Sequence, residues 1–162
     1  MLTIFSKRML IATAVVATFS GCATQPSPMS VADTLAAKSE LSTLNSLIIK
    51  ADLTDTLKGR GPFTVFAPTN SAFAKVPAKT MEDLGKDPAK LKAVLTYHMV
   101  PGKVMSADIK NNNAKTVNGA NLAVSKAGDF VTVEDGMVQT ADLVATNGVV
   151  HIIDSVLIPP SR

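Results

Sequence analysis

The stretch FTVFAPTNSAF, residues 63–73, decides the fold. Its first five residues are rich in β-branched and aromatic side chains, which predicts a buried strand that ends at Pro68. Thr69 or Asn70 can cap a helix directly after it, and Pro77 ends that helix. Its apolar side consists of Ala72, Phe73 and Val76. A buried strand that leads into a helix indicates a domain of mixed class.

Further helical patterns lie on both sides of this stretch. Ser30 followed by Asp33 has the spacing of an N-cap, and Asp87 before Pro88 begins another helix because Pro fits the first turn. Tyr97 and His98 close that helix, where its carbonyl end favours a cationic imidazole. The apolar positions at helical spacing are Ala32, Leu35 and Ala36; Leu44, Leu47 and Ile48 after Ser42; residues near 53–58 before Gly59; and Leu91, Val94 and Leu95.

From Lys115 onward the apolar period changes to two, as in strands. Asn118 and Gly119 predict a hairpin with a type I′ turn, and Asp135 with Gly136 predicts a second turn. Residues 149–156 (VVHIIDSV) predict the last long strand before two prolines end the domain. The flanking strand residues are Thr116, Val117, Leu122, Val124, Val131, Val133, Met137 and Val138. Five or six short strands, with helices gathered in the first half, predict the α+β class.

Three motifs resemble those of fasciclin (FAS1) domains and occur in that family's order. They are TVFAPTNSAF at residues 64–73, Tyr97 and His98 with Val100, Pro101 and Gly102 behind them, and ATNGVVHIIDSVL at residues 145–157. The resemblance covers roughly residues 30 to 160 and is specific as a fold assignment. It implies the fasciclin fold, a β-sandwich-like pair of sheets with a flanking helical layer from the N-terminal half.

The resemblance also implies a non-catalytic adhesion module, because animal and plant members act in cell contact and matrix binding. In animal relatives an Asp-Ile pair upstream of the Asn-Gly-Val-Val-His motif, and the apolar surroundings of the Tyr-His pair, are implicated in integrin binding. The matching candidate residues are Asp142, Leu143, Tyr97, His98, Met99 and Val100, the last four beside an expected exposed apolar patch. Residues around Asp142 depart from the animal motif. The alternatives are a carboxylate that caps loop amides, a histidine that orients the following turn by hydrogen bonding, and a tyrosine in the core.

The amino terminus resembles a bacterial lipoprotein signal. Lys7 and Arg8 precede an apolar run, residues 9–19, which is shorter than the about 20 residues that span a bilayer. Residues 19–22 (FSGC) resemble a lipobox, with Phe where Leu is usual. We expect removal of residues 1–21 and fatty acyl chains such as palmitate on Cys22, the only cysteine. A buried or oxidisable thiol is the alternative.

Residues 22–29 then form a tether, and residues 30–160 form the fasciclin domain. Ala23 rather than Asp after the cysteine implies the outer membrane if the host is Gram-negative. Loss of residues 1–21 leaves fourteen basic against thirteen acidic residues, a net charge of +1. No basic surface then supports a nucleic-acid partner.

No arrangement of residues in the sequence indicates catalysis or metal binding. The chain has no Gly-x-Ser-x-Gly elbow, and no His-x-x-x-His or Cys-x-x-Cys spacing. The glycines of residues 59–61 precede a strand, which indicates a turn rather than a phosphate-binding loop. His151 lies in an apolar strand, where a hydrogen-bonded side chain at the edge of the core is expected. We therefore predict no enzyme activity, no metal and no cofactor.

Two functions remain open. The leading one is a membrane-anchored lipoprotein that mediates adhesion by contacting a protein or glycan of the envelope or extracellular space. The alternative is a carrier of an apolar small molecule such as a carotenoid, since some proteins that resemble this domain bind carotenoids. Seven methionines and 46% hydrophobic residues are compatible with a pliable pocket.

Overall fold

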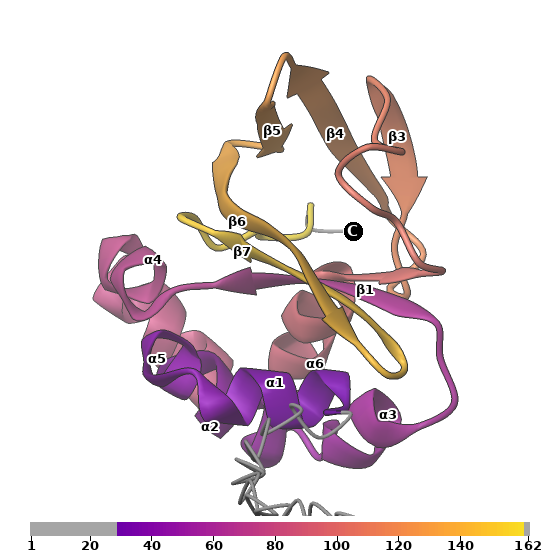
Figure 1. Ribbon diagram of the computed structural model, residues 1–162. Helices are drawn as coiled ribbons and strands as arrows, with labels where there is room; N and C mark the ends of the chain where they lie inside the picture. The colour runs from indigo at the N-terminus through magenta and orange to yellow at the C-terminus, as the bar shows by residue number, and fades with distance from the viewer. Residues whose placement is uncertain (1–28, 161–162) are drawn as a thin grey trace, which may run out of the picture.

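The computed structural model describes residues 29–160 (Figure 1). The expected signal sequence, Cys22 and all but the last residue of the tether lie outside the described residues. The helices are α1 (Val31–Ala37), the short 3-10 helix η1 (Ser39–Leu41), α2 (Ser42–Lys50), α3 (Thr54–Lys58), α4 (Asn70–Lys75), α5 (Ala78–Lys86) and α6 (Pro88–Tyr97). The strands are β1 (Phe63–Pro68), β2 (Met99–Pro101), β3 (Asn112–Lys115), β4 (Asn121–Ala127), β5 (Phe130–Val133), β6 (Gly136–Ala145) and β7 (Gly148–Ile153).

The seven described strands are hydrogen-bonded in the order β2-β1-β7-β6-β5-β4-β3. β1 runs parallel to β7, and every other neighbouring pair is antiparallel. Two register shifts lie in β6 between Val138 and Leu143, where bulges of this kind bend a strand. The sheet therefore has two halves, with β3, β4 and β5 standing away from the helices and β2, β1 and β7 next to them (Figure 1). This arrangement confirms the predicted α+β class.

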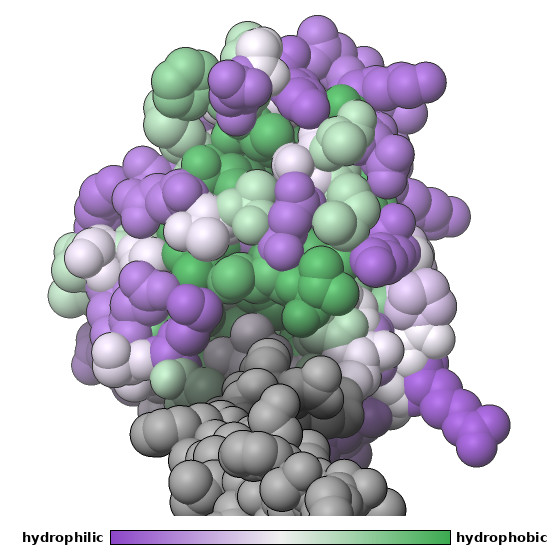
Figure 2. Space-filling view, viewed as in Figure 1, coloured by the Kyte–Doolittle hydropathy of each residue, from purple (hydrophilic) through white to green (hydrophobic). Residues whose placement is uncertain are grey.

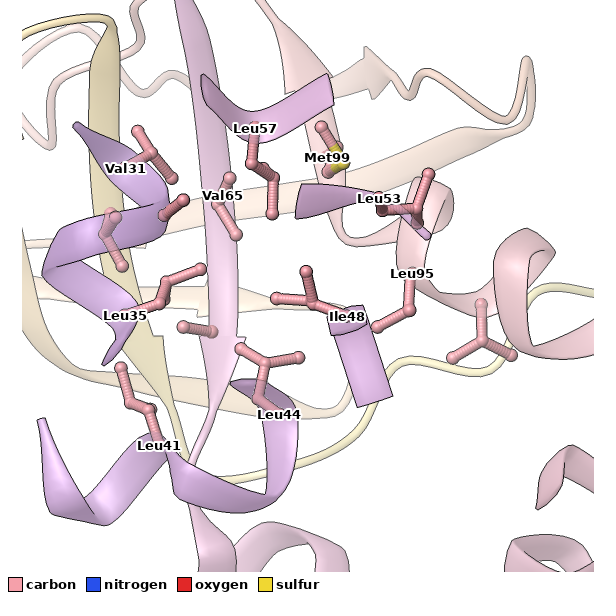
Figure 3. Packing of buried hydrophobic residues seen from close by; sticks show 14 of the residues in the cluster. Val31, Leu35, Leu41, Leu44, Ile48, Leu53, Leu57, Val65, Leu95 and Met99 are labelled. Carbon is pink, nitrogen blue, oxygen red and sulfur yellow. The ribbon is translucent and has the colours of Figure 1, made fainter. Parts of the chain in front are cut away.

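One apolar core lies between the helical layer and the β1–β7 pair. Val65 and Ala67 of β1 belong to it together with Val150 and Ile152 of β7. Figure 3 shows the leucine side chains of the helical layer converging on Val65. The residues that the helical half contributes are Val31, Ala32, Leu35, Leu41, Leu44, Ile48, Leu53, Leu57, Phe73, Leu84, Leu91, Val94 and Leu95. Each such buried side chain contributes about 1.5 to 3 kcal/mol, so apolar burial holds the short helices in place.

A second apolar core lies between the two halves of the sheet. Phe66 of β1 and Ile153 of β7 meet the inward side chains of β4 and β5 there. Those inward residues are Leu122, Val124, Val131 and Val133. Because side chains alternate along a strand, β1 and β7 are buried on both faces, which explains their nearly continuous apolar sequences. The same alternation places His151 on the side of this second core.

The predicted helix starts are confirmed. The Ser30 hydroxyl accepts a hydrogen bond from the Asp33 backbone and completes a capping box. Thr69, rather than Asn70, caps α4, and Asp87 caps α6 with proline in the first turn. α5 occupies a segment for which we predicted no element. Its only buried residue is Leu84, so few apolar side chains mark this helix in the sequence.

The predicted type I′ turn at Asn118 and Gly119 is wrong, although the hairpin exists. The Gly119 N–H donates to the Thr116 carbonyl at 2.9 Å, and Gly119 has a φ of 87° whereas Asn118 has no positive φ. A type I′ turn requires positive φ at both central residues. The second turn lies at Glu134 and Asp135, one residue earlier than predicted, and Glu134 has a φ of 51°.

Candidate functional site

The candidate contact residues at the end of α6 and in β2 are buried. They are Tyr97, His98, Met99 and Val100, whose exposed fractions are 2%, 2%, 2% and 5%. The Tyr97 hydroxyl lies 3.1 Å from the Asn121 carbonyl and 3.2 Å from the Glu134 carboxylate. Burial and the nearby negative charge of Glu134 raise the pKa of Tyr97 to about 12. The expectation that Met99 and Val100 are exposed is therefore wrong, and the alternative of core packing holds for Tyr97.

The His98 side chain is a neutral structural link. The Leu157 N–H donates to His98 Nε2 at 3.0 Å, so Nε2 accepts and the ring proton resides on Nδ1. Nδ1 then donates to the Val94 carbonyl at 2.8 Å. Burial lowers the pKa of His98 to about 4, against the opposing effect of the Val94 hydrogen bond. The expectation of a cationic imidazole is wrong, because complete burial outweighs the carbonyl end of the helix.

His151 is held in the opposite tautomer and is fully buried rather than at the edge of the core. The Asp142 N–H donates to Nδ1 at 3.3 Å, so the proton resides on Nε2, which lies 2.9 Å from the Val104 carbonyl. Burial lowers the pKa of His151. Both ring nitrogens are therefore satisfied, as predicted, and the side chain ties β7 to the loop between β2 and β3.

Asp142 has a φ of 58° at the irregular part of β6. Its carboxylate accepts hydrogen bonds from the Ser106 N–H at 2.7 Å and from the Ser106 hydroxyl. Desolvation works to raise the pKa of Asp142, but the hydrogen bonds from Ser106 outweigh it and hold the pKa below the usual value. This geometry matches the capping alternative. Leu143, the other candidate, is partly buried against the helix-side core.

Phe66 of β1 connects the two histidines. Its backbone N–H donates to the His98 carbonyl at 2.9 Å. Its ring stacks on that of His151, with centroids 5.5 Å apart and an interplanar angle of 24°. The Tyr-His motif, the first motif and the third motif thus form one buried framework around β1. That framework fixes the two halves of the sheet to each other.

Ser106, Asp142 and His151 are close together, but they are not arranged as a catalytic triad. The Ser106 hydroxyl donates to the carboxylate rather than to an imidazole, and the protonated nitrogen of His151 is bonded to a backbone carbonyl. A triad needs the imidazole between the hydroxyl and the carboxylate. Within residues 29–160, no group of three or more His, Cys, Asp or Glu side chains is placed to hold a metal ion.

Asn147, between β6 and β7, was not among the candidate residues, although it lies in the third motif. Its Oδ1 accepts from the Val31 N–H at 2.8 Å, and its Nδ2 donates to the carbonyls of Leu57 and Gly59 at 2.7 and 3.0 Å. The sequence signal that could have identified Asn147 is its position directly before Gly148. A Cβ added at residue 148 would meet the Phe63 carbonyl, so the chain passes close to β1 at this turn. A side-chain amide that hydrogen-bonds to the backbones of several segments is typical of a residue with a structural role.

An apolar groove of about 520 Å³ lies between α5, α6 and the C-terminal segment. Leu84 and Val94 line it together with Ile158, which is 57% exposed. Its polar lining residues are Thr80, Asp83, Lys90 and Asn118. The groove adjoins the buried Tyr-His corner, because the Leu157 backbone bonds to His98 beside it.

Comparisons with known proteins agree with this architecture. A family model described as "Fasciclin domain" matches residues 39–159. "Protein sll1483" of Synechocystis is 42% identical over 138 residues, which cover 83% of this chain and 76% of that protein. "Cell surface glycolipoprotein MPB83" of Mycobacterium bovis is 39% identical over 127 residues, which cover 75% of this chain and 57% of that protein.

Among solved structures, a FAS1 domain pair from the insect cell adhesion molecule fasciclin I superposes with a TM-score of 0.65. It is 19% identical, and the match covers 81% of this chain and 51% of the insect chain. At that identity the likeness bears on the fold alone. The chain thus spans about half the length of the insect protein chain and less than two thirds of the mycobacterial relative.

Proposed function

The chain belongs to the fasciclin domain family, and from that membership we propose that it is a lipid-anchored adhesion protein of a bacterial cell envelope. It contacts a protein or glycan partner through its surface and catalyses no reaction. The signal and lipobox pattern ending at Cys22 supports the anchor. A relative named as a cell surface glycolipoprotein supports the location at the envelope.

One observation carries the proposal. The imidazoles of the motifs form internal hydrogen bonds, whereas uncharged side chains on β5 and β6 are exposed to solvent. His98 and His151 are buried and neutral. Phe130 is 65% exposed and Met137 is 46% exposed. Figure 2 shows hydrophobic residues gathered on the face that carries β6 and β7, between hydrophilic ones. Such a surface is suited to contact rather than to chemistry.

The proposed contact surface, here called the outer β-face, is the side of β4, β5 and β6 that points away from the second core. Thr132 pairs with Met137 across the two strands, and Phe130 lies two residues before it on the same side. The exposed residues of this face include Asn121, Ala123, Ser125, Ala127, Phe130 and Met137. None is charged, although the exposed faces of soluble sheets are usually rich in charge.

Cell adhesion tests this function in two parts. Cys22→Ala should release the protein from the membrane fraction and abolish adhesion, and mass spectrometry of the mature amino terminus should show acyl chains on Cys22. Phe130→Ser with Met137→Ser should weaken adhesion while leaving the anchor and the fold intact. Ile49→Ser is the matched control, since Ile49 is 62% exposed but lies on α2. Equal adhesion by the double variant and the control would exclude the outer β-face as the contact.

The apolar groove supports a second candidate function, transport of an apolar small molecule. Its volume of about 520 Å³ is within the range of ligand pockets. We propose that a ligand with a long apolar body would lie between α5, α6 and Ile158. Ala93→Trp should fill the groove and remove any compound that co-purifies from the native host, whereas Ala123→Trp on the outer β-face should not. Protein from the native host that yields no organic-soluble compound would eliminate this candidate.

A further inference from the structure

Four segments of the chain meet at one end of the domain. The Met29 carbonyl accepts from the Thr146 N–H at 2.9 Å, which places the start of the described chain against the β6–β7 turn. The Phe63 N–H donates to the Asn147 carbonyl at 3.1 Å, and the Gly102 N–H donates to the Pro62 carbonyl at 2.9 Å. We call this region the tether end and define it as residues 29, 58–62, 102–103 and 144–147.

The distance from Cys22 to the tether end is limited by the length of the chain between them. Cys22 and Met29 are seven positions apart, and each residue spans at most about 3.6 Å, so the link reaches about 25 Å. A domain of this size is about 35 to 40 Å across. β3, β4 and β5 stand on the far side of β1 and β7 from α1 (Figure 1). If Cys22 carries the lipid, as proposed above, the tether end is therefore the end nearest the bilayer.

The exposed side chains of the tether end suit a lipid surface. Lys58, Arg60 and Lys103 are exposed cations. Val144 is 60% exposed and Met29 is 36% exposed, so apolar side chains lie among these charges. Basic residues next to apolar ones are attracted to anionic headgroups and can insert at the interface.

Two carboxylates border the tether end, on the first turns of α1 and α3. Asp33 accepts from the Ser30 hydroxyl at 2.6 Å and lies within the electrostatic influence of Lys58. Asp55 precedes Lys58 by three positions on α3. Three cations against two carboxylates, one of which is engaged in a cap, leave the surface weakly positive.

We propose that the tether end is a second, non-covalent membrane contact that binds anionic lipid headgroups and orients the domain. This contact rests on the proposed lipid anchor. It turns the outer β-face, with Phe130 and Met137, away from the bilayer and toward partners. An anchored domain without this contact would sample every orientation that its tether permits.

Lysine footprinting on vesicles tests the orientation with native residues as probes. Since Cys22 is the only cysteine, the mature chain, residues 22–162, can be coupled to a maleimide-headgroup lipid in phosphatidylcholine vesicles with or without phosphatidylglycerol. Anionic vesicles should slow acetylation of Lys58 and Lys103 by about fivefold, as expected for basic side chains at an anionic surface. Lys110 and Lys115, near β3, should change little. Uniform rates at all four lysines, or slower modification of Lys110 and Lys115, would overturn the proposal.

Charge reversal provides the matched comparison. Lys58→Glu with Arg60→Glu should remove the protection of Lys103 on anionic vesicles, whereas Lys110→Glu with Lys115→Glu should preserve it. If both double variants keep Lys103 protected, headgroup charge does not orient the domain. Chemical coupling makes this result independent of natural acylation. Mass spectrometry of the native protein decides the anchor separately, so failure of the proposed function and failure of the orientation are distinguishable.

Discussion

The side chain of Asn147, in the turn between β6 and β7, accepts a hydrogen bond from the backbone N–H of Val31, 116 positions earlier at the start of α1. The same amide donates to the carbonyls of Leu57 and Gly59 at the end of α3. One side chain thus joins the last hairpin to both ends of the three-helix segment from α1 to α3. The Asn147 amide therefore links the helical layer to the sheet through three hydrogen bonds, so its loss should lower the stability of both.

Asn147→Asp should destabilise the domain by about 2 to 3 kcal/mol, because it removes two donors and places a carboxylate against two carbonyl oxygens. Urea denaturation at neutral pH measures the loss. Asn118→Asp is the matched control, since Asn118 also precedes a glycine but lies in the β3–β4 turn, and it should change stability by less than about 0.5 kcal/mol. Similar decreases in the free energy of unfolding for the two variants would contradict the role of Asn147 as a link between the helical layer and the sheet.

Gly148→Ala should cost about 3 kcal/mol, because a Cβ there would meet the Phe63 carbonyl and lie 3.0 Å from a Val31 methyl group. The nearest contact belongs to the backbone of β1, which cannot move without disturbing the parallel β1–β7 pair. Gly85→Ala is the opposite case, since its Cβ would meet only the Lys50 ammonium at 3.7 Å. On α5 that change should stabilise by about 0.5 to 1 kcal/mol. Thermal unfolding of both variants checks the opposite signs.

Local signals explain which parts of the fold could be predicted. The strand at residues 63–67, the caps Ser30, Thr69 and Asp87, and the hairpin at Asn118 depend on neighbours within a few positions. α5 was missed because it has few apolar side chains, with Leu84 buried and Met81 partly buried against the core. The type I′ turn was wrong because only Gly119 adopts a positive φ, a choice that the flanking strand pairing imposes.

The candidate site was harder to predict, because exposure is a property of tertiary packing. Met99 and Val100 have the composition of an apolar patch, yet the pairing of β2 with β1 buries Met99 in the helix-side core and Val100 in the second core. The tautomer of His98 depends on the Leu157 N–H, which is 59 positions away. Phe130 and Met137 carried no motif, and only the pairing of β5 with β6 places them on one outward face.

His98 makes stability depend on pH in a defined window. Its pKa is about 4 in the folded protein against an ordinary value of 6.5, so the unfolded chain binds the proton first as the pH falls. The contribution of neutral His98 is complete above pH 6.5 and declines toward pH 4. The loss is about 2 to 3 kcal/mol. Urea unfolding at intervals between pH 7 and pH 4.5 measures it.

His98→Leu separates this effect from other titrations. The variant should be less stable at pH 7, because it leaves the Leu157 N–H without its acceptor, but its stability should fall less steeply toward pH 4.5. His151, whose pKa is also lowered, supplies the remaining slope. Asp33, Asp142 and Asp154 have pKa values below 3.8, so their contributions are lost only at lower pH. A slope unchanged by His98→Leu would show that His98 does not titrate in this window.

Asp142 should act on the loop between β2 and β3 rather than on the whole domain. Asp142→Ala removes both hydrogen bonds to Ser106 and puts alanine at a φ of 58°, where side chains other than Asn, Asp and Gly are strained. It should cost about 2 kcal/mol and speed amide exchange at Ser106 and Val104 more than in β1.

Asp142→Asn is the matched variant, since asparagine tolerates this backbone conformation and its Oδ1 can still accept from the Ser106 N–H. Its cost should be less than half that of alanine, and exchange at Ser106 should be slower than in Asp142→Ala because the asparagine Oδ1 still accepts from the Ser106 N–H. If Phe130-dependent adhesion stays intact in both variants, Asp142 positions the loop and does not contact the partner. Loss of adhesion in Asp142→Asn with native exchange at Ser106 would instead make the carboxylate part of the contact surface.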